Sequence, residues 1–309
     1  MRNNSSLLGA AARTLITTDL SGGGELLDQQ VADFYDIPNT KTVLMQRVSK
    51  MAVYASEGEK DVRLFGERSR RLVVTEAVDG GHRSQPTLSK VSWAVKKTYD
   101  AWETSKDVFL YNIEQEGWAA SEFAGRARVW QQDEEDCMIN GDTTSADDFL
   151  KINQGILALC AAGCNDVDAS ALAGAGDFDE AVLYAAAKAI PTKYEGGDYM
   201  WIMSRRQKLN LWEQLTLRAG DLSDSLLEGK KTKPLGYELL EVPRWSTTQV
   251  FLCDPEVFIF FYKYIMKYAS TDQGKDAVTR DVVVSVMFGW TDYNILDKAS
   301  IVRVHTLNA

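Results

Sequence analysis

The sequence is poor in the residues that most often carry enzyme chemistry. Its two histidines are His82, in a charged segment, and His305, four residues before the C-terminus, so a Ser-His-Asp or Cys-His arrangement is not expected. Two of its four cysteines, Cys160 and Cys164, are spaced CxxxC, but no second pair and no nearby histidine complete a zinc site. We therefore predict free thiols in a reducing compartment, no catalytic residues and no metal site.

The glycine-rich segments lack the rest of the nucleotide-binding motifs. The glycines at 22–24 are not followed by the Lys and Ser or Thr of a phosphate-binding loop, and no predicted strand precedes them. Residues 174–176 (GAG) lack the third glycine of a dinucleotide fingerprint. We expect no nucleotide cofactor.

Positive charge and long apolar runs are also scarce. The chain has 34 Lys and Arg against 44 Asp and Glu, a formal net charge of −10, whereas tight DNA binding normally needs clustered basic residues. No apolar run approaches membrane-spanning length, and the N-terminus lacks a signal-peptide core. We expect a protein that is made in the cytoplasm, without a membrane partner, unless it is released inside a larger particle.

The pattern of the remaining residues predicts the α+β class, because strands and helices do not alternate in a regular βαβ series. A strand is predicted over 91–102, with Trp93, Val95 and Tyr99 on one face, and a strand covered on both faces over 282–288. Ser204 is predicted to cap a helix with Leu209, Trp212 and Leu215 on one side. A short helix is predicted between residues 147 and 159, and residues 177–180 (DFDE) resemble a capping box that opens a helix reaching Ala189. Strands are predicted over 199–203, 237–242, 249–252 and 301–304, and residues 257–264 fit a helix or a strand.

The longest predicted element is a helix over residues 112–140, roughly 40 Å long at 1.5 Å per residue. Such a length is more typical of a building block than of an enzyme with a pocket. We expect Gly141 to end the helix in a left-handed conformation. The side predicted to be apolar consists of Ala119, Phe123, Ala127, Trp130, Cys137 and Met138.

Four acids, residues 133–136, lie near the C-terminal end of this helix. A helical wheel spreads them around the axis, so we interpret them as a solvated face and not as metal ligands. Acids at this end of a helix oppose its dipole, so we hypothesise that Glu134 or Asp136 pairs with a basic residue of another segment or subunit. The candidate partners lie in a basic segment earlier in the chain and are Arg63, Arg68, Arg70 and Arg71. The alternative interpretation of that segment is a solvated basic turn.

Two segments have too little apolar surface to fold alone. Residues 1–39 form a weakly patterned arm that is interrupted by glycines. Residues 56–85 combine many charges with glycine turns and predict a long two-stranded excursion. Because an isolated hairpin is marginally stable in water, this excursion needs a neighbouring surface.

Together these features resemble the major capsid proteins of tailed double-stranded DNA phages, which have the Hong Kong 97-type fold. The resemblance covers roughly residues 43–304 and is clearest from 88–108 into the long helix. Family members similarly close their spine helix with acids, an apolar pair and Asn-Gly-Asp, followed by a Gly-Ile-Leu-like segment. The matching stretches here are DEEDCMINGD at 133–142 and NQGIL at 153–157, with closing strands at 281–288 and 299–304.

The resemblance implies a domain division. The N-terminal arm would be residues 1–41 and the extended loop residues 53–90. The axial domain would be residues 191–274. The peripheral domain would hold the spine helix, 112–140, and comprise residues 42–52, 91–190 and 275–309.

The resemblance also implies a function and partners. The chain would be a non-enzymatic virion protein, assembled in the host cytoplasm as hexamers and pentamers of an icosahedral shell that encloses DNA without reading its sequence. Because only about forty residues precede the ordered part, we expect a separate scaffolding protein and no cleaved scaffold, along with a portal and, as a further candidate, a decoration protein. Lys60, Lys90 and Asn294 are present, but their spacing predicts no crosslink. The alternative is an encapsulin-type shell that holds a cargo enzyme; the long arm favours the phage capsid.

Overall fold

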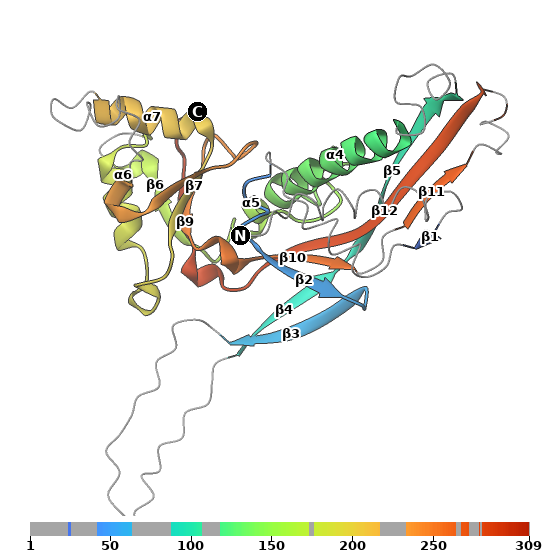
Figure 1. Cartoon of the computed structure of the whole chain (residues 1–309). Coiled ribbons are helices and arrows are strands. Elements are labelled where there is room, and N and C mark those ends of the chain that lie inside the picture. Colours follow the sequence, from blue (N-terminus) through green and yellow to red (C-terminus); the bar gives the residue numbers. More distant parts are fainter. Residues whose placement is uncertain are drawn as a thin grey trace, which may run out of the picture.

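Two sheets organise the chain in the computed structural model (Figure 1). One carries a long helix and forms an extended body, the other is covered by shorter helices, and a two-stranded pair projects from the first. The structure describes residues 24–25, 42–63, 88–106, 118–172, 176–216, 233–263, 267–271, 278 and 280–308.

The first sheet has six strands built around β12. Along one edge β12 pairs antiparallel with β5, and along the other it pairs with β11 and then β10. β2 is parallel to β10, and β1 pairs with β11. The strands are β1 (Gly24–Glu25), β2 (Ser49–Val53), β5 (Lys96–Ser105), β10 (Phe258–Lys263), β11 (Lys267–Thr271) and β12 (Val282–Ile295).

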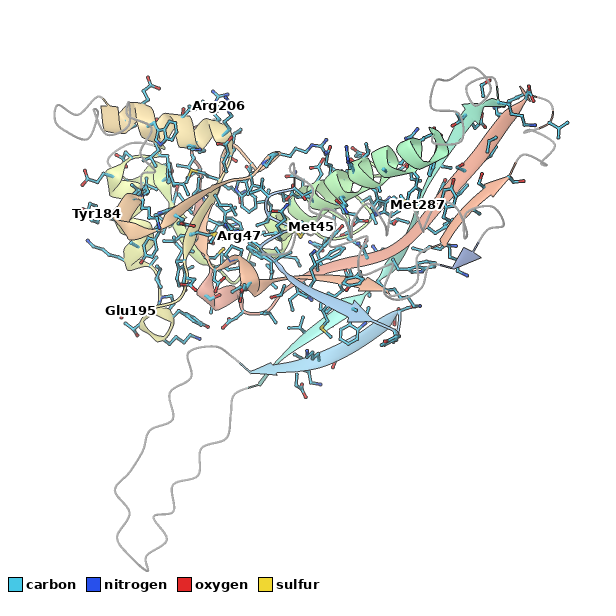
Figure 2. All side chains as sticks on the ribbon, viewed as in Figure 1. Met45, Arg47, Tyr184, Glu195, Arg206 and Met287 are labelled. Atoms are coloured by element: carbon cyan, nitrogen blue, oxygen red, sulfur yellow. The ribbon has the colours of Figure 1, made fainter. Side chains whose placement is uncertain are left out.

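The strand predicted over 282–288 is confirmed, but it continues to Ile295 and is not covered equally on both faces. From Ser285 onward alternate residues of β12 are buried, and the residues between them are only half-buried. The buried side faces α4 (Trp118–Asn140), as Met287 beneath that helix illustrates (Figure 2). The sheet therefore has one covered face and one partly open face.

Helix α4 packs its predicted apolar side on this sheet. Phe123, Ala127, Trp130, Cys137 and Met138 are all buried, and the ring of Phe123 meets Tyr268 edge-on at 5.3 Å. The predicted end at Asn140 is confirmed, while residues 112–117 of the predicted helix lie outside the described part of the chain. The described helix is about 35 Å long.

Gly141 ends α4 for a reason other than the one predicted. Its backbone is not left-handed; its N–H donates to the Cys137 carbonyl at 2.9 Å. A Cβ atom there would lie 2.5 Å from the carbonyl oxygens of Asn153 and Cys137 and 3.0 Å from the nitrogen of Gly155. The position requires glycine because two backbone segments approach it closely.

The second sheet has five strands in the order β6–β13–β9–β7–β8. Helices α6 (Glu180–Lys188) and α7 (Arg205–Thr216) accompany it (Figure 1). Ser204 accepts from the Gln207 N–H at the start of α7, as predicted. The cap of α6 is Asp179, which accepts from the Val182 N–H, and not Asp177, the first residue of the predicted capping box. The strands are β6 (Asn165–Asp168), β7 (Met200–Met203), β8 (Glu238–Glu241), β9 (Val250–Cys253) and β13 (Val302–His305).

Two predicted faces are wrong. Leu209 of α7 is 50% exposed, whereas Leu211 and Gln207 are fully buried, because the Gln207 amide donates to the Thr247 and Asn308 carbonyls. The strand predicted over 91–102 is broken at Val95 into β4 (Leu88–Ala94) and β5, which shifts the alternation and leaves Tyr99 71% exposed.

The structure assigns two other predicted segments. The short helix predicted between residues 147 and 159 is α5 (Ile156–Leu159), which follows a series of turns. Residues 255–257 form a 3-10 turn that leads into strand β10. No helix in the described part of the chain is both long enough and apolar enough to span a membrane.

The sheets group residues differently from the ranges expected for the domains. The five-stranded sheet includes β6 and β13, which lie outside residues 191–274. Strands β10 and β11 lie inside that range but pair in the six-stranded sheet. The domain division itself stays a prediction.

Candidate functional site

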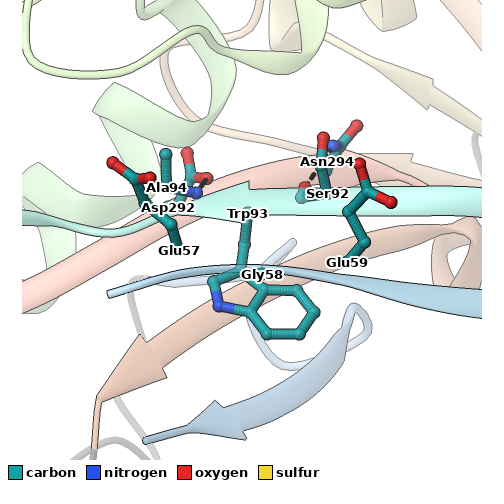
Figure 3. Close-up of a pocket in the computed structure, with 8 residues that line it drawn as sticks. All are labelled: Glu57, Gly58, Glu59, Ser92, Trp93, Ala94, Asp292 and Asn294. Carbon is teal, nitrogen blue, oxygen red and sulfur yellow. Dashed lines mark hydrogen bonds between the residues drawn. The ribbon is translucent and has the colours of Figure 1, made fainter. Parts of the chain in front are cut away.

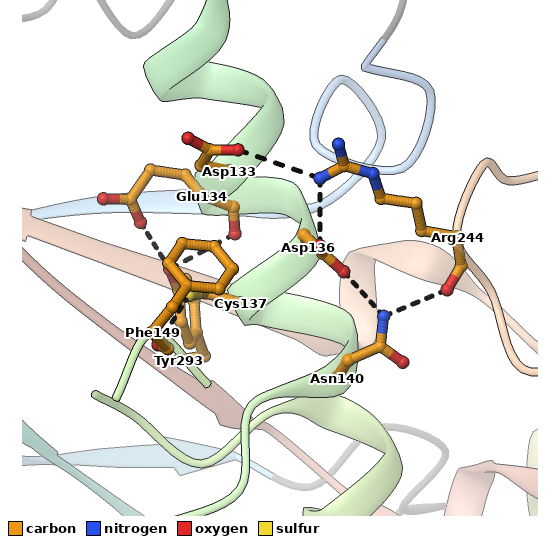
Figure 4. Close-up of polar contacts among 8 residues, drawn as sticks. All are labelled: Asp133, Glu134, Asp136, Cys137, Asn140, Phe149, Arg244 and Tyr293. Carbon is orange, nitrogen blue, oxygen red and sulfur yellow. Dashed lines mark hydrogen bonds and ion pairs between the residues drawn. The ribbon is translucent and has the colours of Figure 1, made fainter. Parts of the chain in front are cut away.

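The acidic end of α4 contacts three separate parts of the chain, at Leu44, Arg244 and Tyr293. Figure 4 shows the contacts with Arg244 and Tyr293. Glu134 faces β12: the Tyr293 hydroxyl donates to its carboxylate, and the Thr291 hydroxyl donates at 3.3 Å. The residue is only 7% exposed, and no basic side chain of the described residues pairs with it. Burial therefore raises the pKa of Glu134 to about 7, although the two hydroxyl donors act in the opposite direction.

Glu135 points to the other side of the helix and holds the segment before β2. Its Oε1 accepts from the backbone N–H groups of Leu44, at 2.7 Å, and Met45, at 3.1 Å. Burial raises the pKa of Glu135, and these backbone donors oppose that shift. The carboxylate thus satisfies two buried donors that would otherwise lack a partner.

Asp136 and Asp133 face Arg244, which follows β8 of the five-stranded sheet. Nη1 of Arg244 lies 2.9 Å from Oδ2 of Asp136 and 3.8 Å from Oδ1 of Asp133. The Asn140 amide donates to Asp136 at 2.7 Å and to the Arg244 carbonyl at 3.0 Å. These contacts connect α4 to the second sheet and place a cation beside acids that oppose the helix dipole.

The interpretation of residues 133–136 as a solvated face is wrong for Glu134 and Glu135, which are buried. A signal for Glu134 was present: it lies four residues after Trp130 and four before Met138, on the apolar side of the helix. Asp136 does pair with a basic residue, but one of its own chain. Arg68, Arg70 and Arg71 lie outside the described residues, as does the side chain of Arg63, so the hypothesis of contacts between subunits stays a prediction.

We expect Arg244→Ala to lower the free energy of unfolding of the isolated subunit by about 1 kcal/mol in low salt, because the pair is partly exposed and screened. Urea unfolding of the wild type and the variant in low and high salt measures this difference in the free energy of unfolding, which should be smaller in high salt. Arg280→Ala is the matched control, since Arg280 pairs with Glu103 at 3.1 Å near an end of β5 and β12. An equal effect of the two substitutions would contradict a special role for Arg244.

The second notable region is the base of the pair formed by β3 (Glu57–Arg63) and β4. The two strands are antiparallel, from Glu57 opposite Ala94 to Arg63 opposite Leu88, as the predicted excursion requires. Trp93 stacks on Phe261 of β10 at 5.4 Å, and a Cβ on Gly58 would lie 2.4 Å from the Trp93 ring. Residues 64–87 lie outside the described part.

Polar contacts fix the same base to β12 (Figure 3). The Ala94 N–H donates to the Asp292 carboxylate at 2.7 Å, and the Asn294 amide donates to the Ser92 carbonyl at 2.7 Å. A shallow pocket of about 480 Å³ lies here, lined by Glu57, Gly58, Glu59, Ser92, Trp93, Ala94, Asp292 and Asn294. Burial raises the pKa of Asp292, and the backbone donors oppose it. Within the described residues, the β3–β4 pair is thus held to the body through its half nearest β5, from Val91 to Ala94.

The cysteines are free thiols, as predicted. Cys137, Cys160 and Cys253 are buried and Cys164 is half-buried. In the ranges that the structure describes, no group of His, Cys, Asp or Glu is arranged to hold a metal ion.

The fold of the chain is similar to that of several solved phage capsid structures. The chain is similar to a protein in a structure of the satellite phage P4 procapsid, a particle solved together with its size determination (Sid) protein. The TM-score is 0.68, and the identity is 13% over 100% of this chain and 98% of that one. It is similar to the capsid protein of a native GTA particle, with a TM-score of 0.63 and 14% identity over 88% of this chain and 92% of that one. No family model and no curated protein matches the sequence.

One of the similar solved structures is an encapsulin. The chain is similar to the holo-SrpI encapsulin complex of Synechococcus elongatus PCC 7942, with a TM-score of 0.56 and 9% identity over 90% of this chain and 95% of that one. The chain therefore has the Hong Kong 97-type capsid fold of the α+β class, and the resemblance seen in the sequence is confirmed at the level of the fold.

Proposed function

We propose that the protein is the major capsid protein of a tailed phage, a non-enzymatic subunit that assembles as hexamers and pentamers into an icosahedral shell around double-stranded DNA. The observation that carries this proposal is the similarity to the P4 procapsid protein along the whole of both chains. The match is therefore not limited to one small domain that otherwise different proteins could share.

The shape of the subunit supports assembly. The β3–β4 pair projects from the body (Figure 1), and its described contacts with the body, through Val91, Trp93 and β12, lie in the half nearest β5. A lone two-stranded pair is marginal in water, so a neighbouring copy supplies the surface that it needs. Closed symmetry repeats each such contact many times, which makes weak interfaces sufficient.

The sheets suggest how the domains divide. We place the axial domain in the five-stranded sheet with α6 and α7, and the peripheral domain in the six-stranded sheet with α4 as the spine helix. The β3–β4 pair begins the extended loop, and residues 1–41 are the arm. The ion pairs of Asp136 and Asp133 with Arg244 connect the first two parts.

The partners follow from the same proposal. The net charge of −10 suits a wall that encloses DNA without binding it tightly, in a virion assembled in the host cytoplasm. A scaffolding protein, a portal and a decoration protein would accompany the shell; two similar structures are named together with a Sid protein and with gp26 decoration proteins.

A second candidate is an encapsulin-type compartment that holds a cargo enzyme, which the similarity to the SrpI shell favours. The long N-terminal arm favours the phage capsid. The two functions differ in what fills the shell.

Negative-stain electron microscopy tests both. The protein should be expressed alone and together with the products of neighbouring genes, and the particles should be purified and their contents analysed. Shells that need a scaffolding partner support the capsid, and uniform shells filled with one enzyme support the compartment. A monodisperse subunit that forms no shell in either setting would contradict both functions.

A further inference from the structure

Strand β5 has a long free edge. Its ten residues pair with β12 from Lys96 opposite Thr291 to Ser105 opposite Val282. Within the described ranges, no strand pairs with the other edge of β5. An unpaired edge of this length invites another strand unless something covers it.

The outer face of β5 and β12 is partly open: Tyr99 is exposed, and Trp290 at one end packs against the cluster that contains Val91 and Phe261. The register places Lys97 opposite Trp290 and Tyr99 opposite Phe288, on the side away from α4, whereas Trp102 is buried on the helix side. Tyr99 is 71% exposed, and its ring lies 6.3 Å from the ring of Phe288. We call this surface the β5 face; it consists of Lys97, Tyr99, Ala101, Val286, Phe288 and Trp290.

The β5 face carries positive charge over its aromatic rings. The Lys97 ammonium lies 4.2 Å from the centre of the Phe288 ring and 5.4 Å from that of Trp290. Lys263 lies over Trp290 from another side at 6.0 Å, and Lys267 of β11 is opposite Phe288. A complementary partner would present acids on an extended strand.

Strand β3 has that chemistry. Glu57, Glu59 and Asp61 are exposed and share one face, because alternate residues of a strand point the same way. The opposite face, at Gly58, packs on Trp93. Of the described strands, only β4 pairs with β3, so the other edge of β3 is free within that set as well.

A subunit cannot place its own β3 on its own β5 face. Glu57 is opposite Ala94, next to the start of β5, and the antiparallel pairing then carries β3 away from β5 toward Leu88. The acids therefore reach the β5 face only of another copy.

We propose that the β5 face and the free edge of β5 bind the acidic face of β3 from a second copy of this chain. The inference rests on the proposed function, since it names the surface that receives the projecting pair in a shell. Backbone pairing at the edge supplies affinity, and the lysines over the aromatic rings select the acidic strand.

A charge reversal tests the proposal in the full chain. Lys97→Glu should lower the yield of shells by at least about tenfold, because like charges would face each other at every copy of the contact. Adding Glu57→Lys and Asp61→Lys to the same chain should restore it. Lys193→Glu is the matched control: this lysine also lies over an aromatic ring, 4.3 Å from the centre of Tyr194, but in the turn before β7. Circular dichroism of the unassembled subunits checks that each variant folds.

A wild-type yield from Lys97→Glu, or an equal loss from Lys193→Glu, would overturn the β5 face as the docking surface. A loss that the β3 reversals do not restore would overturn β3 as its occupant.

A second measurement does not depend on closed shells. Chains carrying Tyr99→Cys are mixed with chains carrying Glu59→Cys and are oxidised, and the bond between positions 99 and 59 is mapped by mass spectrometry. That bond supports the contact even if the protein never closes a shell. Failure to form a shell would contradict only the proposed function. Its absence overturns the contact.

Discussion

Removing residues 56–85 should leave a folded, soluble subunit that no longer builds shells. The six-stranded and five-stranded sheets contain neither β3 nor β4, so both cores remain intact. The subunit would lose the extended loop, which in the proposed shell lies on neighbouring copies. Because each shell repeats that contact many times, we expect the particle yield to fall by at least about 100-fold. Circular dichroism measures the fold, and electron microscopy with particle counting measures assembly.

A smaller deletion removes the rest of the extended loop and keeps its base, the β3–β4 pair. Replacing residues 64–87 by Asn-Gly joins Arg63 to Leu88 through a two-residue hairpin turn and keeps the pairing of β3 with β4. Trp93 would still stack on Phe261, and Ala94 would still donate to Asp292. We expect this variant to fold as stably as the wild type and also to fail in assembly. Normal particles from either deletion would refute the role of the extended loop in assembly.

Glu134→Gln should stabilise the isolated subunit above pH 7 and change its dependence on pH. The pKa of Glu134 is about 7 in the folded chain against an ordinary 4.5, so the folded state binds the proton more tightly than the unfolded state does. The free energy of unfolding therefore falls as pH rises from about 4.5 to about 7 and then levels. The loss from this one group is about 3 kcal/mol. Glutamine has no such proton, so the variant should lack this part of the decline.

Urea unfolding of the wild type and the variant at pH 5 and pH 8 measures that difference. Burial also raises the pKa of Glu135, Asp133 and Asp292, but these groups are present in both proteins and cancel in the comparison. Tyr293→Phe is the partner variant. It removes the hydroxyl that donates to the Glu134 carboxylate, so it should cost more stability at pH 8 than at pH 5. In the Glu134→Gln background its effect should not vary with pH. Parallel pH curves for wild type and Glu134→Gln would contradict the burial of a titrating carboxyl.

Much of the local structure could be predicted from the sequence. The end of α4 at Asn140, the cap at Ser204, and the antiparallel pair beside the 56–85 segment follow from neighbouring residues. These features depend on hydrogen bonds and periodicity within a few residues, which a sequence states directly.

The errors have two causes. Leu209 was expected on the apolar side of its helix, yet it is half exposed, and Gln207 is buried because carbonyls of Thr247 and Asn308 accept from its amide. Tyr99 was expected to share a face with Trp93, but the break at Val95 reverses the alternation. In each case a distant segment, or a single irregular residue, changed which side chains face the core.

The sequence by itself determined the α+β class, the long helix with its acidic end and glycine stop, and the order of elements that resembles a capsid subunit. Only the tertiary structure decided that Glu134 and Glu135 are buried, that Arg244 holds Asp136, and that Gly141 is needed for space and not for a left-handed turn. The physical reason is that a buried polar group is stable only where its partners are. Those partners, Tyr293, Leu44 and Arg244, lie about 90 to 160 residues away along the chain, beyond the reach of any local pattern.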